Sequence, residues 1–210
     1  MFDWNGAYES QRSKRSAGGI CIRVKICGIT TIRDALIAEE EGADAIGVIV
    51  CSDSKRCITI KRAREIFEAL SPKTEKICVT NTINNSDVDV IMSLKPDALQ
   101  ISRDLIIPEN IKTKVYRYIS DYGDIPLCDA LVIDNSKGMG IAYDRDFALK
   151  VAKISKVPII LAGGLTPDNV FDAIKDISPF AVDVSSGVEK SKGVKDRQKL
   201  RKFIEICREA

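Results

Sequence analysis

The sequence predicts an α/β fold of one domain, a compact (β/α)8 barrel. Three observations support this prediction. Short runs rich in β-branched residues recur along the chain, and segments with helical periodicity separate them. Several of these runs are apolar throughout, as expected for strands that are buried on both faces of a parallel sheet. The last two runs end in glycine-containing turns, which suits loops at the mouth of a barrel.

Turn residues bound each expected strand. The expected strands are Arg23–Cys27, Asp44–Val50, Lys76–Thr80, Ala98–Ser102, Lys114–Ile119, Ala130–Asp134, Pro158–Ala162 and Phe180–Val184. Because helical segments alternate with these strands along the whole chain, we expect the strands to be parallel.

Apolar residues at helical spacing predict the helices. The expected helices are Thr31–Glu41, Lys61–Leu70, Ser86–Leu94, Asp144–Ser155, Pro167–Ile177 and Lys195–Arg208. Pro167 follows a threonine, and proline is favoured at the first position of a helix. Two further helices, Asp104–Ile111 and Ser120–Cys128, are expected to be short because each contains a proline.

The length of the chain constrains the barrel. The chain has 210 residues, whereas barrels of this type usually have about 250. The connections must therefore be short, and the fourth and fifth helices reduced. A doubly wound open sheet is the alternative, but the chain has neither Gly-x-Gly-x-x-Gly after the first strand nor Gly-x-x-x-x-Gly-Lys-Ser.

Composition narrows the classes of function. The formal net charge is +2 and no basic block stands out, so we expect no nucleic-acid partner. No apolar run is long enough to span a membrane. Residues 1–22 are polar and lack the apolar core of a signal peptide. We therefore expect a disordered or non-native leader, followed by a cytoplasmic catalytic domain over residues 23–210.

The cysteines do not form a metal-binding pattern. The chain has 7 cysteines at irregular spacings, no Cys-x-x-Cys and no histidine, so we expect no metal site. Without a signal sequence the thiols are expected to be free, and most of them to be buried as small apolar residues. The absence of histidine leaves acid–base chemistry to Asp, Glu, Cys, Lys or Tyr.

Two turns near the end of the chain are candidates for binding phosphate. Gly163 and Gly164 follow the seventh expected strand, and Ser185 and Ser186 follow the eighth. Barrels often bind phosphate between the loops after these two strands, where backbone N–H groups and hydroxyls can face the ligand. The sequence therefore predicts a phosphorylated small molecule as the ligand.

Two reactive side chains are expected at the same end of the barrel. Cys27 ends the first strand and Asp134 ends the sixth. Lys25 shares a strand face with Cys27, and a nearby cation favours the thiolate. Arg56, in the polar loop after the second strand, can offer a guanidinium fork to a carboxylate.

These residues belong to longer motifs that resemble one family. The motifs are Lys25-Ile26-Cys27-Gly28-Ile29-Thr30, Gly42-Ala43-Asp44, Ser54-Lys55-Arg56, the run from Leu161 to Val170 and the run from Phe180 to Glu189. Over residues 23–210 the chain closely resembles phosphoribosylanthranilate isomerase, an enzyme of tryptophan biosynthesis.

The resemblance implies a compact barrel and an Amadori rearrangement that needs no cofactor. The expected reaction converts N-(5-phosphoribosyl)anthranilate into 1-(2-carboxyphenylamino)-1-deoxyribulose 5-phosphate. By resemblance, Asp134 is the general acid that opens the ribose ring, and Cys27 is the general base that removes the proton from C2. The expected assembly is a monomer or a homodimer.

The resemblance also implies the residues that bind the substrate. Arg56 matches the arginine that holds the anthranilate carboxylate, and Asp183 matches an aspartate near the sugar hydroxyls. The residues that match the phosphate site are Gly163, Gly164, Ser185 and Ser186.

The chain departs from the family pattern at several points. Ser102 and Arg103 stand where the family usually has His-Gly, and Lys137-Gly138-Met139-Gly140 replaces a Gly-Gly-(Ser/Thr)-Gly loop. One alternative is another ribose-phosphate barrel enzyme, of the epimerase or the indole-forming synthase type. The other is a phosphate-binding barrel without catalysis. A metal-dependent epimerase would need histidines, which this chain lacks.

Overall fold

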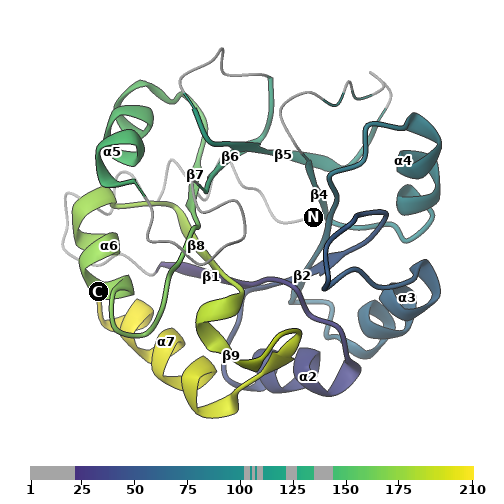
Figure 1. Cartoon of the computed structure of the whole chain (residues 1–210), viewed down its shortest axis with the longest axis horizontal. Coiled ribbons are helices and arrows are strands. Elements are labelled where there is room, and N and C mark those ends of the chain that lie inside the picture. The colour runs from purple at the N-terminus through teal and green to yellow at the C-terminus, as the bar shows by residue number, and fades with distance from the viewer. Residues whose placement is uncertain (1–21, 102–104, 106, 108–110, 122–126, 135–143) are drawn as a thin grey trace.

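The strands close into one parallel barrel. The computed structural model describes residues 22–101, 105, 107, 111–121, 127–134 and 144–210. In this part of the chain, strands β1 to β8 pair in sequence order, and β8 pairs with β1 to complete the ring (Figure 1). The predicted (β/α)8 barrel is confirmed, and the open sheet is excluded.

The barrel strands match the sequence prediction to within a single residue at each described end. They are β1 (Arg23–Ile26), β2 (Ala45–Ile49), β3 (Glu75–Val79), β4 (Ala98–Ile101), β5 (Lys114–Ile119), β6 (Ala130–Ile133), β7 (Ile159–Leu161) and β8 (Ala181–Val184).

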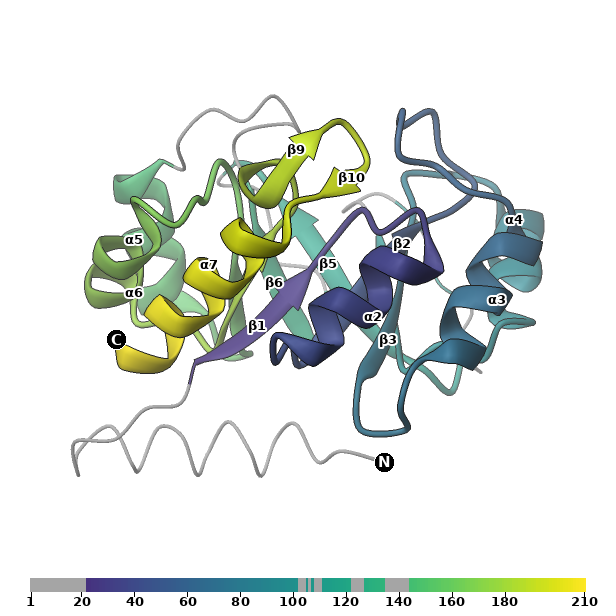
Figure 2. The same cartoon turned by 90° about the horizontal axis from the view of Figure 1, so that it is seen from below.

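The described helices lie around the outside of the barrel (Figures 1 and 2). They are α2 (Ile32–Glu40), α3 (Ile60–Ala69), α4 (Asn85–Met92), α5 (Arg145–Ile154), α6 (Val170–Ile177) and α7 (Arg197–Glu209). Much of the two short helices predicted at Asp104–Ile111 and Ser120–Cys128 lies outside the described residues. In the described part of the chain, no helix has the length and apolar character needed to cross a bilayer.

Ile22 is the first residue that the structure describes. Residues 1–21 of the expected leader lie outside the described residues. Ile22 is buried in the core, and its carbonyl accepts a hydrogen bond from the guanidinium of Arg208 on α7. Ile22, which the sequence prediction placed in the leader, therefore packs with the barrel.

The two faces of each strand bury different side chains. On β8, Val182 and Val184 point outward and pack in the layer between the barrel and the helices. Ala181 belongs to a separate cluster inside the barrel, which Tyr116 and Phe180 help to fill. The helices pack against the outward, apolar faces of the strands. The inward faces of the strands can therefore carry polar groups.

Helix α6 begins three residues later than predicted, because Asn169 stabilises a turn before it. The Asn169 side-chain oxygen accepts a hydrogen bond from the backbone N–H of Thr166 at 2.8 Å, and its amide nitrogen donates to the carbonyl of Gly164 at 3.0 Å. Pro167 therefore lies in this turn, and the helix starts at Val170. The asparagine ties the start of the helix to the turn after β7.

A short hairpin after β8 was not predicted. Strands β9 (Glu189–Ser191) and β10 (Val194–Lys195) pair antiparallel, and they lie at the end of the barrel toward which the strands point (Figure 2). The sequence prediction assigned Lys195 to the last helix, but that helix begins at Arg197. Asp196 is its N-cap and accepts hydrogen bonds from two backbone N–H groups, which fixes the boundary.

We expect Asp196→Ala to lower the free energy of unfolding by about 1 kcal/mol, the usual effect of removing an N-cap side chain. Urea denaturation measures this change. Asn84→Ala is the matched control, because Asn84 is the N-cap of α4 but makes no side-chain capping hydrogen bond. Equal losses for the two variants would contradict the capping role of Asp196.

Candidate active site

Every predicted site residue lines one cavity at the C-terminal ends of the barrel strands. The cavity has a volume of about 200 Å³. The predicted residues around it are Cys27, Arg56, Asp134, Gly163, Gly164, Asp183, Ser185 and Ser186. They come from the ends of β1, β6, β7 and β8 and from the loop after β2, so the closed barrel brings together residues that are far apart in sequence.

A buried ion pair forms the floor of this cavity. Lys25 and Asp183 are partners in the register of β1 and β8, and the Lys25 Nζ lies 2.6 Å from the Asp183 Oδ2. Lys25 also donates to the Gln100 Oε1 at 2.6 Å. Burial acts to lower the pKa of Lys25, but the charge and hydrogen bond of Asp183, together with Cys27, outweigh burial and raise that pKa. Lys25 is therefore a cation fixed inside the barrel.

Cys27 lies directly above this ion pair. Its backbone N–H donates to the carbonyl of Val184 at 2.9 Å, and its side chain is buried. A Cβ atom at Gly47 would lie 3.1 Å from both the Cys27 Sγ and the Lys25 Cε, so the glycine leaves room for the two side chains. Burial raises the pKa of the Cys27 thiol, and the charges of Lys25 and Lys195 oppose this effect.

The turns after β7 and β8 have the close-approach geometry expected of a ligand site. Gly163 and Gly164 have φ of +90° and +61°, which favours glycine at both positions. A Cβ atom at Gly187 would lie 1.9 Å from the carbonyl oxygen of Leu165, so only glycine lets the two turns meet. The paired turns form one side of the cavity.

Two buried oxygen atoms in the cavity have no hydrogen-bond partner among the described residues. They are the Oδ1 of Asp183 and the Oγ of Ser185. A buried polar atom without a partner costs roughly 1–3 kcal/mol. Such atoms are expected where a polar ligand supplies the partner, so the cavity is suited to a ligand that carries hydroxyl or phosphate groups.

Asp134 follows β6 directly and lies on the same cavity. Its backbone N–H donates to the carbonyl of Ile119 at 3.3 Å. The side chain is half-buried, and its negative charge is one cause, after burial, of the raised pKa of Tyr118. The Lys137-Gly138-Met139-Gly140 segment that follows lies outside the described residues.

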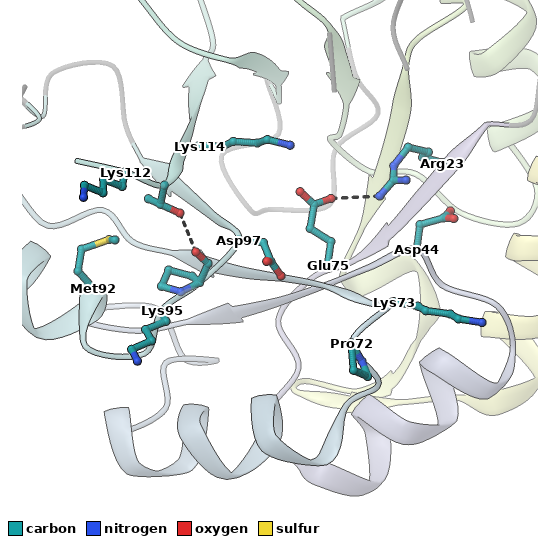
Figure 3. Close-up of a pocket in the computed structure, with 12 residues that line it drawn as sticks. Arg23, Asp44, Pro72, Lys73, Glu75, Met92, Lys95, Asp97, Lys112 and Lys114 are labelled. Atoms are coloured by element: carbon teal, nitrogen blue, oxygen red, sulfur yellow. Dashed lines mark hydrogen bonds and ion pairs between the residues drawn. The ribbon is translucent and has the colours of Figure 1, made fainter. Parts of the chain in front are cut away.

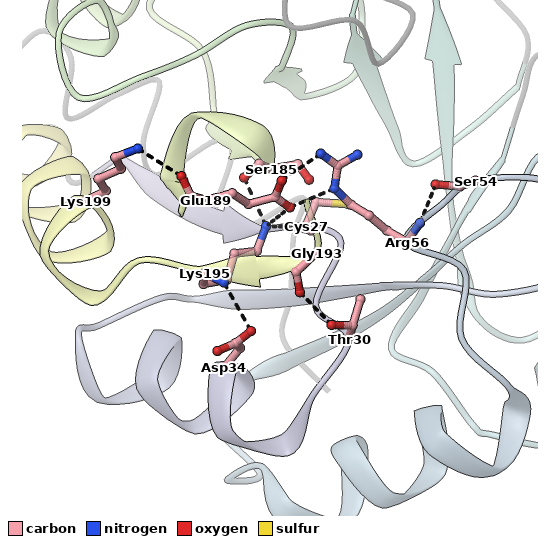
Figure 4. Close-up of polar contacts among 10 residues, drawn as sticks. All are labelled: Cys27, Thr30, Asp34, Ser54, Arg56, Ser185, Glu189, Gly193, Lys195 and Lys199. Atoms are coloured by element: carbon pink, nitrogen blue, oxygen red, sulfur yellow. Dashed lines mark hydrogen bonds and ion pairs between the residues drawn. The ribbon is translucent and has the colours of Figure 1, made fainter. Parts of the chain in front are cut away.

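Arg56 is held by Glu189, and Glu189 is in turn bound by Lys195 (Figure 4). The sequence prediction assigned neither of these two hairpin residues to the site. Its Nε and Nη2 donate to the two oxygens of the Glu189 carboxylate at 2.7 and 2.8 Å. The Nζ of Lys195 donates to the Glu189 Oε1 at 3.2 Å, and also to the carbonyls of Cys27 and Ser185 at 2.7 and 3.0 Å.

A larger hollow of about 460 Å³ adjoins the cavity over the ends of β2 to β5. Arg56 and Gln100 line both spaces. Ile49, Val79 and Tyr118 add apolar and aromatic surface to the hollow. A ligand with a polar end in the cavity and an aromatic end in the hollow would therefore lie beside Arg56.

Another hollow lies at the opposite end of the barrel (Figure 3). It has a volume of about 860 Å³, and Arg23, Glu75 and Lys114 are among its lining residues. The Glu75 carboxylate accepts hydrogen bonds from Tyr116 and Arg23 at 2.8 and 3.1 Å. Active sites of these barrels lie at the C-terminal ends of the strands. The residues at the N-terminal ends are therefore expected to contribute to the stability of the barrel.

The closed parallel barrel and its polar cavity place the chain among the (β/α)8-barrel enzymes. The family model described as "N-(5'phosphoribosyl)anthranilate (PRA) isomerase" matches residues 24–206. N-(5'-phosphoribosyl)anthranilate isomerase of Methanoregula boonei is 49% identical over 191 residues, which cover 90% of this chain and 98% of that protein. The chain therefore belongs to the phosphoribosylanthranilate isomerase family, the isomerases of tryptophan biosynthesis.

Solved structures of this family have the same fold. The isomerase of Thermus thermophilus superposes with a TM-score of 0.77 at 32% identity, covering 88% of this chain and 98% of that one. An isomerase in complex with reduced 1-(o-carboxyphenylamino)-1-deoxyribulose 5-phosphate superposes with a TM-score of 0.73 at 30% identity. The match covers 90% of this chain and 100% of that one.

We expect Lys25→Met to lower the free energy of unfolding by about 3–5 kcal/mol, because it leaves the buried carboxylate of Asp183 without a counter-charge. Urea denaturation of wild type and variant measures the loss. Lys202→Met is the matched control, since Lys202 pairs with Asp168 at the surface and exposed pairs contribute at most about 1 kcal/mol. A loss no larger than that of the control would contradict the role of Lys25 in the core.

Proposed function

We propose that this chain converts N-(5-phosphoribosyl)anthranilate into 1-(2-carboxyphenylamino)-1-deoxyribulose 5-phosphate by an Amadori rearrangement. The observation that carries this proposal is the cavity shared by Cys27, Asp134 and the two turns after β7 and β8. A thiol and a carboxylic acid come from β1 and β6, on different sides of the ring of strands. A small sugar between them can be protonated on one side and deprotonated on the other.

In the proposed mechanism Asp134 is the general acid. It donates a proton to the ribose ring oxygen, the bond between that oxygen and C1 breaks, and the anilino nitrogen forms an iminium with C1. The iminium acidifies the C2–H bond. Positioned general acids typically contribute about 10²–10⁴-fold to the rate. Asp134 lies at a strand end, where the barrel fixes its backbone.

Cys27 is the proposed general base. It takes the proton from C2 to give an enolamine, which tautomerises to the ketone. No atom is gained or lost overall. The buried ammonium of Lys25 lies beneath the thiol and favours its anion. Because the iminium already withdraws electrons from C2, a thiolate is a sufficient base.

The remaining predicted residues bind the substrate in this proposal. The turns at Gly163, Gly164, Ser185 and Ser186 hold the phosphate. The Oγ of Ser185, which has no hydrogen-bond partner among the described residues, supports this placement. The Oδ1 of Asp183 likewise has no partner in the described part of the chain and is suited to a sugar hydroxyl. Arg56 binds the anthranilate carboxylate, and the adjoining hollow takes the aromatic ring.

The roles of the proposed acid and base can be tested by substitution. We expect wild type to convert the substrate, generated in situ, and expect Cys27→Ala and Asp134→Asn each to lower kcat by about 10²–10⁴-fold. The decrease in anthranilate fluorescence follows the reaction. Cys128→Ala serves as a control at a half-buried thiol outside the cavity. An inactive wild type would disprove the proposed reaction, whereas full activity in both variants would disprove the assigned roles.

The pH dependence provides a separate test of the base. Because burial raises the pKa of the Cys27 thiol, kcat/KM should increase with pH through and above the ordinary thiol value of about 8.5. The base acts only when deprotonated, so below its pKa the rate should fall as the thiolate fraction falls. We expect Cys128→Ala to keep this profile. A profile that is flat between neutral and alkaline pH would exclude a cysteine base.

A further inference from the structure

The contacts of Arg56 divide its guanidinium into two edges. The inner edge, Nε and Nη2, is occupied by both oxygens of Glu189. Among the residues that the structure describes, the guanidinium makes no other side-chain or backbone hydrogen bond. The outer edge, formed by Nη1 and Nη2, keeps N–H groups in the parallel arrangement that binds a carboxylate with two hydrogen bonds. Arg56 lines both the cavity and the hollow, so this edge is available to a ligand.

Lys195 determines the charge of the cluster formed by Arg56, Glu189 and Lys195. Its Nζ has three acceptors, the carbonyls of Cys27 and Ser185 and the carboxylate of Glu189. Burial lowers the pKa of Lys195, and the charge of Glu189 opposes this effect. A neutral amine has only two N–H bonds, so three acceptors favour the ammonium form. Burial would raise the pKa of Glu189, but Arg56 and Lys195 together lower it, so the carboxylate is ionised.

Two cations therefore share one carboxylate in a buried place. The side-chain exposures are 12% for Arg56, 5% for Glu189 and 1% for Lys195. The cluster keeps one positive charge that its own members do not neutralise. A buried excess charge is costly unless an opposite charge joins it, so the cluster favours an anionic group at the outer edge of Arg56.

We propose that Glu189 is a positioning residue that makes the site selective for a substrate with a carboxylate on its aromatic ring. Glu189 holds the inner edge of Arg56, so the outer edge stays aimed at that carboxylate, and Lys195 leaves the cluster with one positive charge to attract it. This inference rests on the proposed function, and in particular on the role of Arg56.

A pair of ligands separates this role from a general structural one. The first ligand is reduced 1-(o-carboxyphenylamino)-1-deoxyribulose 5-phosphate, and the second is the same molecule without the ring carboxylate. Titration calorimetry gives Kd for both ligands with wild type, Glu189→Gln and Glu189→Asp. The selectivity is the ratio of the two Kd values. Asp keeps the charge of Glu189 but is too short to hold both edge nitrogens, so it separates geometry from charge.

We expect wild type to prefer the carboxylated ligand, and expect both Glu189 variants to reduce this preference by about tenfold or more. The loss should come from weaker binding of the carboxylated ligand alone. Glu41→Gln is the matched control, because Glu41 accepts hydrogen bonds from Arg197 and Arg201 on the outer surface, at 2.6 and 2.8 Å. We expect this variant to keep the wild-type preference.

Several results would overturn the inference. An unchanged preference in Glu189→Gln would show that Arg56 needs no support, and an increased preference would show that Glu189 competes with the ligand. Equal weakening of both ligands would indicate a structural role only. If Glu189→Asp alone kept the preference, charge and not geometry would be responsible. If wild type showed no preference, the assigned role of Arg56 would itself be wrong, which is distinguishable from a failure at Glu189. Should Glu189→Gln fail to fold, Glu189→Asp still decides between these results.

Discussion

The pairing of the first strand with the last is the constraint on which the site depends. The register of β1 on β8 aligns Lys25 with Asp183 and places the backbone of Cys27 on Val184. Residues that are 158 positions apart thereby form an ion pair of 2.6 Å inside the barrel. Neither charge is stable there alone, so the closure of the barrel and the formation of the polar floor stabilise each other.

Much of this architecture could be predicted because its signals are local. A buried parallel strand is a short apolar run, and each run here ends within one residue of the end of the observed strand. The positions of Cys27 and Asp134 on the cavity could be predicted because active sites of barrels lie at the C-terminal ends of the strands. The start of α6 was predicted wrongly because Thr166-Pro167 is a good local cap, whereas the Asn169 side chain stabilises a turn instead. That contact depends on the conformation of the whole loop.

The carboxylate and ammonium groups behind Arg56 could not be predicted, because their signals are not local. Glu189 lies 133 residues from Arg56, and no spacing rule connects them. Lys195 precedes a helix with clear periodicity, so the sequence pattern included it in that helix. Its actual role depends on the hairpin, which directs Nζ back to the end of β1. Such a residue is found only once the fold shows which carbonyls need a donor.

The hairpin also determines which substitutions can be interpreted. Lys195 contacts the carbonyl of the proposed base, the carbonyl of Ser185, which is proposed to bind phosphate, and the carboxylate that holds Arg56. Its replacement would disturb three functions at once, and residues in one network do not have additive effects. The Glu189 side chain reaches only the Arg56 and Lys195 members of that network. In the proposal, Arg56 binds one functional group of the ligand, its ring carboxylate. Binding of two ligands that differ only in this carboxylate can therefore isolate the contribution of Glu189, whereas the rate of reaction alone cannot.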